Sequence, residues 1–596
     1  GDGLYGFPGA LYLNTVSNLA TWTGPITVGS ASRIRVVNNY AQLVLANTVI
    51  GNQTPLLLSS EGTGTLMTFQ DTLSIGDEAV LTKDGSGTVV LAGNSNLCGS
   101  TVINAGTLAI ATTNPPRIGD VTVNGGILQI GDGGPNASFP PGLINLAGAS
   151  SSLRFNSSTD LTLDKEVVGQ GGMSKYASNT VVILSSNSFY GNVTTGSGSP
   201  SPNGRGAGII ELRNSYGLGD GMVGKTVEMV RAELQLVGGL TIPAPISFNI
   251  SGGSFVTSEG PGLIPIRSVS GNNIIEGGIN LIGGAGNGEV SVDAGSTLTI
   301  QGSITANTTG RTLVLGGAGN GIINGSIYDN GVNIPAVTKQ GSGTWTLNGY
   351  NFYTGGTTIQ GGTLVLGANS SISTSTNITL ANNAVLNVSA LASGFTVDYA
   401  QTLRGDGTVQ GNVTVNGYIR PGTSVGALAI TGSLNLAGET VMELNRTNAV
   451  NADLISAASI VLGGNLTVVN IGPPLQAGDT FNLFDGALSG AFLSTTLPDL
   501  GSSTLFWDTS LFQSQGILKV GTTQAPPPTI LPPAIVGANL VIQVSSLAGF
   551  NYILEASPAV GPTSWTPLET KAGGGVLTFT IPIGSAPQRF FRITVQ

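Results

Sequence analysis

Hydrophobic and polar residues alternate in short runs along most of the chain. Examples are Thr-Trp-Thr-Leu at 344–347, Thr-Thr-Ile at 357–359 and Thr-Leu-Val-Leu at 363–366. A period of two is typical of β-strands that bury one face. Gly or Asn interrupts the pattern every few residues, as turns between short strands require. The pattern therefore predicts an all-β fold of the sandwich, propeller or solenoid type.

The chain also contains an internal repeat. Residues 81–110 and 337–366 align without a gap at an offset of 256 residues and share 14 of 30 positions. A looser copy covers about 174–212. None of these segments has the blade signature and the regular length of about 40–50 residues that propellers show. A β-solenoid, in which coils of roughly 20 residues stack on one another, fits the spacing better.

Composition supports this interpretation. Gly accounts for 91 of the 596 residues, and charged residues make up only 9%. Glu, Lys and Arg, on which long soluble helices depend, are therefore scarce. No Gly-X-Y period indicates collagen, and a hydrophobic content of 40% excludes ordinary disorder. The remaining residue types favour strands and tight turns.

The residues that are missing limit the chemistry. The chain has no His, which excludes His-based triads and His-ligated zinc. Its single cysteine, Cys98, cannot form a disulfide within the chain, and we expect no cofactor. The net charge of −10 and the lack of Lys/Arg runs argue against nucleic acid as a partner. No apolar run is long enough for a membrane helix, so we expect no membrane insertion.

The repeat resembles the autotransporter-associated β-strand repeat of bacterial surface proteins. Both copies share the opening Thr-Lys-x-Gly-x-Gly-Thr-x-x-Leu-x-Gly and the closing Gly-Thr-Leu. This resemblance implies a right-handed parallel β-helix in the passenger part of a surface protein. Residues 403–520 resemble the segment that ends such helices. The remaining sequence does not resemble a translocator barrel, so we expect delivery by another export route.

These features predict four parts of the chain. Residues 1–29 form an N-terminal arm with the first strands, and residues 30–521 form the β-solenoid. The Pro-rich segment 522–534 is expected to be a stiff linker. Residues 535–596 contain five alternating runs and resemble a small C-terminal β-sandwich found after such repeats in secreted bacterial proteins. Because the chain begins with Gly1, we expect an extracellular or cell-surface protein whose signal has been removed.

An enzyme is the main alternative, because right-handed β-helices also house polysaccharide lyases and hydrolases. Such enzymes need paired carboxylates, or a calcium ion held by Asp and Glu beside a base. The densest candidate is the group Asp160, Asp164 and Glu166, which alternation places on one face. A solvated strand end explains the group more simply, and we predict no catalytic residue.

Two further sets of residues are predicted to be structural. Lys83 and Lys339 occupy the same position in the two repeats, which favours side chains that reach carbonyl groups at coil corners. Inward-facing aliphatic side chains should form stacked ladders from coil to coil. These ladder residues are Leu91, Leu108, Leu347, Ile359 and Leu364.

The predicted function is structural: a subunit of a cell-surface fibre or filament, with adhesion as an additional role. Aromatic residues make up only 6% of the chain and are spread along it, which favours this function. The alternative is a carbohydrate-binding or polysaccharide-cleaving secreted β-helix protein. Surface glycans are candidate partners under both interpretations.

Head-to-tail polymerisation is the most specific expectation. A solenoid has two ends with unpaired strand edges, which invite another chain. The N-terminal segment is Gly-rich and carries apolar residues without an obvious local partner, namely Leu4, Tyr5, Phe7, Leu11 and Tyr12. We expect this arm to add a strand to the C-terminal module of the next subunit, near Phe590 and Phe591. The alternative is that the arm folds back on its own first coil.

Overall fold

The computed structural model describes most of the chain. The described residues are 11–14, 19–97, 99–114, 117–195, 208–252, 256–257, 260–261, 263–283, 286–331, 335–522, 527–559, 565–584 and 589–595. The chain divides into two compact units, Gly1–Arg420 with Leu428–Leu434 and Pro421–Ala427 with Asn435–Gln596. The structure is almost entirely β, and the one helix in the described residues is α1 (Phe512–Gln515).

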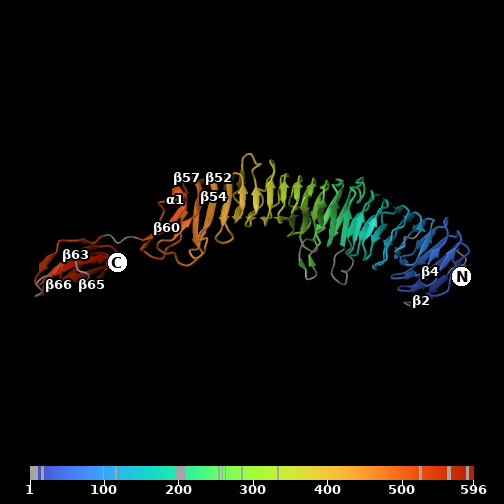
Figure 1. Cartoon of the computed structure of the whole chain (residues 1–596), viewed down its shortest axis with the longest axis horizontal. Coiled ribbons are helices and arrows are strands. Elements are labelled where there is room, and N and C mark those ends of the chain that lie inside the picture. The colour runs from blue at the N-terminus through green and yellow to red at the C-terminus, as the bar shows by residue number, and fades with distance from the viewer. Residues whose placement is uncertain are drawn as a thin grey trace. The chain divides into compact units, whose positions relative to one another are not determined.

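Unit 1 is a stack of coils whose strands pair in parallel with the strands of the coils before and after (Figure 1). One sheet of this unit contains nine strands in sequence order. They are β1 (Leu11–Asn14), β4 (Ser32–Val37), β7 (Leu56–Ser60), β10 (Leu81–Asp84), β13 (Thr101–Ile103), β16 (Val121–Val123), β18 (Ile144–Leu146), β21 (Val167–Gly169) and β24 (Ser188–Phe189). The predicted all-β fold with a parallel β-solenoid is confirmed.

Coil length varies along unit 1. Leu81 pairs with Thr101, so the coil of the first repeat has twenty residues, as predicted. Leu234 pairs with Ile266, so the corresponding coil has thirty-two. Longer loops at the corners absorb the extra residues, because the paired strands must keep their spacing of about 4.8 Å.

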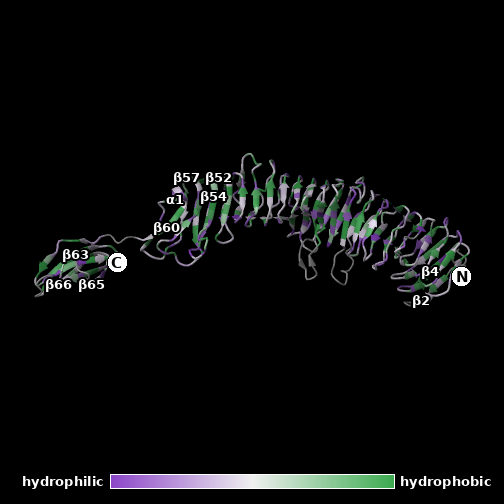
Figure 2. Cartoon of the chain, in the orientation of Figure 1, coloured by the Kyte–Doolittle hydropathy of each residue, from purple (hydrophilic) through white to green (hydrophobic). Residues whose placement is uncertain are grey.

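Buried side chains at paired positions of successive coils stack on one another and form the core of the solenoid. Val89 pairs with Leu108, Leu108 pairs with Leu128, and all three side chains are fully buried. Alternation along each strand sends every second residue into this core. Hydrophobic residues accordingly concentrate in the strands (Figure 2). Parallel stacking in register explains why the short alternating runs of the sequence are sufficient to specify the fold.

Unit 2 combines parallel and antiparallel strands. The strand β53 (Glu439–Leu444) pairs in parallel with β55 (Asn465–Asn470), and β54 (Leu454–Leu462) pairs in parallel with β57 (Phe484–Gly490). An antiparallel sheet follows, formed by β56 (Thr480–Asn482), β59 (Leu505–Asp508) and β60 (Ile517–Thr522).

The C-terminal strands form two antiparallel sheets. The strand β63 (Asn539–Ser546) pairs with β61 (Thr529–Ile530), β62 (Ala534–Val536) and β66 (Gly575–Pro582). The strand β64 (Asn551–Ser557) pairs with β65 (Thr566–Ala572) and β67 (Phe590–Val595). Buried residues of both sheets join in one hydrophobic cluster, formed by Ile542, Val544, Tyr552, Leu554, Phe579, Ile581 and Ile593.

The five strands predicted in residues 535–596 are present as β63, β64, β65, β66 and β67, but the segment 522–534, expected to be only a linker, contributes to two more. The two additional strands, β61 and β62, lie in or beside the segment expected to be a Pro-rich linker. Prolines flank these short strands, and proline is tolerated at sheet edges, where its missing N–H breaks no ladder bond. In the described residues no helix is long and apolar enough to span a membrane.

Candidate functional site

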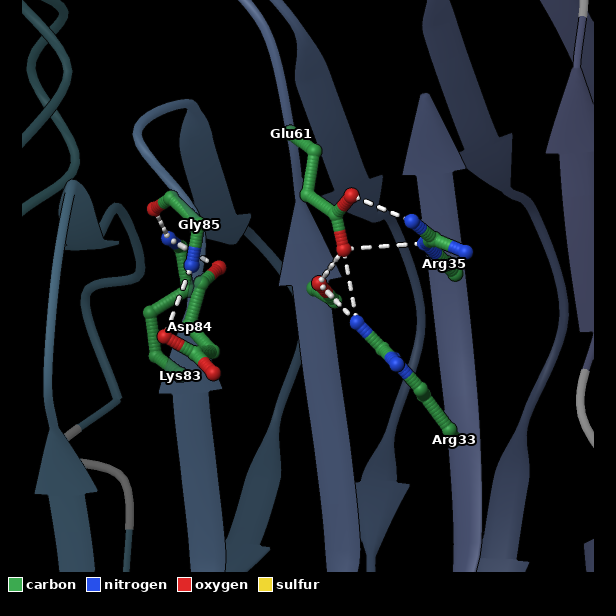
Figure 3. A network of polar contacts seen from close by, with 7 residues as sticks. Arg33, Arg35, Glu61, Lys83, Asp84 and Gly85 are labelled. Atoms are coloured by element: carbon green, nitrogen blue, oxygen red, sulfur yellow. Dashed lines mark hydrogen bonds and ion pairs between the residues drawn. The ribbon is translucent and has the colours of Figure 1, made fainter. Parts of the chain in front are cut away.

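Each repeat contains a lysine whose charged end lies inside a coil corner. Lys83 is fully buried on β10, and its Nζ donates hydrogen bonds to three backbone carbonyl oxygens, those of Asp84 at 2.8 Å, Gly85 at 2.7 Å and Ala105 at 3.0 Å. Figure 3 shows the side chain of Lys83 turning back toward Gly85. An ammonium group has three donors and no acceptor, so three carbonyls satisfy it completely.

The second repeat reproduces this arrangement. Lys339, at the end of β41 (Ala336–Lys339), is also fully buried and donates to the carbonyl oxygens of Gln340 at 2.8 Å, Gly341 at 2.9 Å and Gly361 at 3.0 Å. Burial lowers the pKa of Lys83 and of Lys339 to about 8. Both lysines therefore hold coil corners together, which is the structural role that their equivalent positions predicted.

The Gly of the closing Gly-Thr-Leu belongs to the same corner. Gly106 has φ +67°, and Gly362 has φ +62°. A Cβ on either residue would lie 2.8 Å from the lysine Nζ and 2.4 Å from a carbonyl oxygen. The left-handed backbone and the lack of space both require glycine here. We call the lysine, its three carbonyls and this glycine the lysine corner.

The looser repeat copy contains a related corner. Lys175 is fully buried and donates to the carbonyl oxygen of Ala177 and to Oδ1 of Asn179, the latter at 2.7 Å. In the looser alignment Lys175 takes the place of Lys83. Burial lowers the pKa of Lys175 to about 7. A buried lysine can therefore mark a corner even where Ala177 and Asn179 replace the two glycines that follow it in the repeat.

A charged network joins neighbouring coils on the outer face near the lysine corner of Lys83 (Figure 3). Arg33 and Arg35 extend from β4 to the carboxylate of Glu61, which follows β7, at 2.6 Å and 2.5 Å. Hydrogen bonding to Arg35 holds the pKa of Glu61 below its usual value. Because the opposite charges satisfy one another across adjacent strands, this network stabilises the sheet.

The acidic residues singled out as a calcium site do not converge. Asp160 accepts a hydrogen bond from the backbone N–H of Thr180 at 2.8 Å, and Asp164 lies 3.7 Å from the ammonium of Lys165. Within the described ranges, no group of three His, Cys, Asp or Glu residues is placed to hold a metal, and Glu166 joins no such group. Asp160, Asp164 and Glu166 are therefore not arranged to bind one calcium ion together.

The sequence also named core ladder residues and residues of a subunit interface. The expected ladder residues Leu91, Leu108, Leu347, Ile359 and Leu364 are all fully buried. Of the expected interface residues, Leu11 and Tyr12 lie in β1, where they pair with Ile34 and Arg35. Phe590 and Phe591 are partly buried in β67. Leu4, Tyr5 and Phe7 lie outside the described residues, as does Cys98.

Sequence reasoning missed a row of exposed aromatic side chains at the second repeat. Tyr350 is 55% exposed, Phe352 is 51% exposed and Tyr328 is 38% exposed. The rings of Tyr350 and Phe352 have centroids 4.8 Å apart, and Phe352 pairs with Tyr328 of the preceding coil. We call these three residues the aromatic row. Two of its rings are in contact, and the third residue lies on the adjacent coil.

Buried neighbours fix the backbone of the aromatic row. Asn351, between the two exposed rings, is buried, accepts from the N–H of Ile327 at 3.0 Å and donates to the carbonyl of Gly349 at 2.9 Å. Tyr353 is fully buried, with its hydroxyl 2.7 Å from Oγ1 of Thr357, and burial raises its pKa. The two exposed rings are therefore presented on an ordered backbone.

An alignment of the two repeats could have revealed the aromatic row from the sequence. At the offset of 256 residues, Tyr350 and Phe352 align with Asn94 and Asn96. The inward neighbours Asn351 and Tyr353 align with Ser95 and Leu97, which are also buried. Equivalent positions therefore carry polar outward residues in one copy and aromatic ones in the other.

Residues 81–110 and 337–366 match the Passenger-associated-transport-repeat (PATR) family. The chain carries two passenger-associated transport repeats. The resemblance found in the sequence is confirmed at the same residues, whereas the looser copy at 174–212 is not among the matched segments. The lysine corner is thus a structural feature that both passenger repeats share.

One curated relative is the Adhesin BmaC autotransporter of Brucella suis biovar 1 (strain 1330), which is 25% identical over 163 residues. The matched part is 24% of this chain and 4% of that protein, so the chain spans only a small fraction of its relative. Among solved structures, the Haemophilus influenzae Hap adhesin is similar with a TM-score of 0.30 and 13% identity. That match covers 84% of this chain and 64% of the Hap chain.

Proposed function

We propose that the chain is a cell-surface or secreted passenger protein of the adhesin type, with a structural rather than a catalytic role. The observation that carries the proposal is the pair of passenger repeats built into a parallel β-solenoid. The similarity to an adhesin autotransporter supports it. A solenoid of this kind displays a long series of strands and loops to its surroundings, as attachment to a surface requires.

The chemistry of the chain supports a non-catalytic role. The sequence has no His, so general acid–base chemistry would depend on other groups, such as carboxylates, lysines or tyrosines. The buried lysines are occupied with backbone carbonyls, and Asp160 and Asp164 are engaged with neighbouring groups. We therefore expect no turnover of polysaccharides by the purified chain.

Surface location and adhesion are tested in the cells that produce the chain. Antibody against the full chain should label intact cells as strongly as permeabilised ones, and protease added outside should remove the label. Latex beads coated with the chain should adhere to a surface to which albumin-coated beads do not. Label only in permeabilised cells would contradict the proposal.

Head-to-tail assembly is the more specific part of the proposal. In the described residues, the first strands β1, β2 (Leu19–Trp22) and β3 (Ile26–Val28) each pair with one later strand only, namely β4, β5 (Gln42–Leu45) and β6 (Val49–Gly51). Leu19 and Trp22 are exposed on β2. Unpaired edges with apolar side chains favour the addition of strands from another chain.

The structure changes how this assembly is tested. Leu11 and Tyr12 pair with β4 of their own chain, so they belong to the first coil, and an exchanged arm must lie before Leu11. Deletion of residues 1–10 keeps β1 and should abolish long filaments in negative-stain electron microscopy while leaving the circular dichroism unchanged. Filaments that persist in this variant would exclude exchange of the arm, and an absence of filaments in the parent chain would exclude the polymer.

A further inference from the structure

The fold does not require the aromatic row. Asn94 and Asn96 stand in the first repeat where Tyr350 and Phe352 stand in the second, and the inward residues beside them are buried in both copies. Large aromatic side chains are favourable when they are buried and unfavourable when they are left in water. A cluster of such rings on an outer face usually marks a place where something binds. The rings of the second repeat therefore indicate a ligand rather than a packing need.

The surroundings of the row are polar and nearly uncharged. A ladder of exposed amides leads up to it along the chain, with Asn348 donating to Asn324 at 2.8 Å and Asn324 donating to Gln301 at 2.8 Å. Asn348 lies two residues before Tyr350 in the sequence. Amides offer both donors and acceptors, which suits a ligand rich in hydroxyl groups.

Charge narrows the ligand class further. The only cation of the second repeat, Lys339, is buried against carbonyls and cannot meet a ligand. The carboxylate of Asp329, which follows Tyr328, accepts hydrogen bonds from Thr354, including one from Oγ1 at 2.7 Å. A carboxylate without a neighbouring cation would repel an anionic ligand. The site therefore favours an uncharged ligand.

The size of the row suits a small ligand. An aromatic side chain can bury about 150–250 Å², so three half-exposed rings offer roughly 300 Å². A stable protein interface needs about 800 Å² from each partner. The row is thus large enough for one or two sugar rings and too small to hold a second copy of the chain by itself.

We propose that the aromatic row binds a neutral glycan whose sugar rings stack on Tyr350 and Phe352. The amides of Asn324 and Asn348 and the carboxylate of Asp329 contact its hydroxyl groups. The ordered backbone of the row reduces the entropy lost on binding. This inference rests on the proposed adhesin-type function and names the ligand class that the function would use.

The two repeats supply the variants for the test. The double variant Tyr350→Asn with Phe352→Asn introduces the residues of the first repeat, so the corner is expected to fold. The full chain and the variant are applied to an array of neutral, sialylated and sulfated oligosaccharides. We expect the parent chain to bind a subset of the neutral glycans and the double variant to bind them at least about tenfold more weakly.

Two controls separate stacking from general surface effects. Tyr399→Asn removes a tyrosine that is 81% exposed at another place, and it should leave binding unchanged. The exchange Tyr350→Phe with Phe352→Tyr keeps both rings and should retain most of the binding. The thermal midpoints of all variants should match that of the parent chain.

Three results would overturn the inference: no binding to neutral glycans, binding that the double variant retains, or binding restricted to acidic glycans. Self-association of the parent chain that the double variant loses would show instead that the row joins copies of the chain. Antibody labelling of intact cells is independent of these measurements. A chain that is labelled at the surface but binds no neutral glycan would leave the proposed function intact and exclude only the glycan site.

Discussion

The two passenger repeats share the lysine corner, but they differ in buried core residues and in residues exposed on the outer face. In each copy a buried lysine donates to three carbonyls, and a glycine with positive φ closes the corner. The hydrogen-bond lengths to the lysine Nζ agree within 0.2 Å between the copies. The residues that the two copies hold in common thus include those that form the lysine corner.

The buried residues of the two repeats differ most in size at one position. Val89 of the first repeat aligns with Trp345 of the second, and both are fully buried. Trp345 fits because Gly321 lies beside it in the preceding coil, where a Cβ would come within 2.3 Å of the indole ring. Val89 pairs instead with Met67. The repeat therefore specifies the corner, while each pair of neighbouring coils adjusts its own core volume.

The largest difference between the copies should appear when this position is truncated. Trp345→Ala should lower the free energy of unfolding by about 3–5 kcal/mol, because it leaves a cavity beside Gly321. Val89→Ala should cost about 2 kcal/mol, since a smaller side chain is removed. Hydrogen-exchange mass spectrometry of the two coils measures both changes locally. Equal losses of protection would mean that Trp345 is not packed as described.

The lysines should show the opposite behaviour, with equal effects in the two copies. Lys83→Met and Lys339→Met should each cost about 2–3 kcal/mol, because the buried carbonyls lose their donor. Lys165→Met is the matched control, since Lys165 is partly exposed and its ammonium lies near Asp164 at the surface. Denaturant unfolding of the three variants tests this expectation. A mild effect at one repeat and a large one at the other would contradict a shared corner.

Substitution of the closing glycine should have a smaller but still similar effect in both repeats. Gly106→Ala and Gly362→Ala should each cost about 1–3 kcal/mol, because a non-glycine residue must adopt a strained positive φ. A Gly295→Ala variant separates backbone strain from crowding. Gly295 has φ +79° but no atom within 4 Å of the added Cβ. Thermal unfolding should rank Gly295→Ala as the mildest of the three, and the reverse order would show that crowding at the corner is unimportant.

The smallest effect concerns pH. Burial lowers the pKa of Lys83 and Lys339 to about 8, below the value of 10.5 expected in the unfolded chain. Between these values the unfolded state binds more protons than the folded state, so stability rises with pH and is lost as pH falls toward 8. The gain from pH 8 to 9 is up to about 1 kcal/mol for each lysine. The double variant Lys83→Met with Lys339→Met should have a flatter pH profile in denaturant unfolding, and an identical profile would contradict these pKa values.

The sequence was sufficient for the parts of the structure that repeat. Alternation, the glycines and the equivalent lysines predicted the parallel coils and the corner role of Lys83 and Lys339. Features that occur only once in the chain could not be predicted from the repeat pattern. The strands β61 and β62 are too short and too rich in flanking proline to be recognised, and only pairing with β63 makes them strands.

The candidate sites show the same limit. Alternation placed Asp160, Asp164 and Glu166 on one face, but a strand of three residues, β20 (Leu161–Leu163), separates the two aspartates and does not fix where their side chains turn. The aromatic row was missed because low aromatic content was judged over the whole chain. Tyr328 and Phe352 lie 24 residues apart in sequence and become neighbours only through the stacking of coils.

An experimental structure of the full chain at a resolution that shows side chains tests the shared lysine corner most directly. We predict that the Nζ atoms of Lys83 and Lys339 will each lie within about 3 Å of three backbone carbonyl oxygens, the distance of ordinary hydrogen bonds. The carbonyls should belong to equivalent residues of the two repeats. A lysine side chain that points to solvent in either repeat would contradict the account.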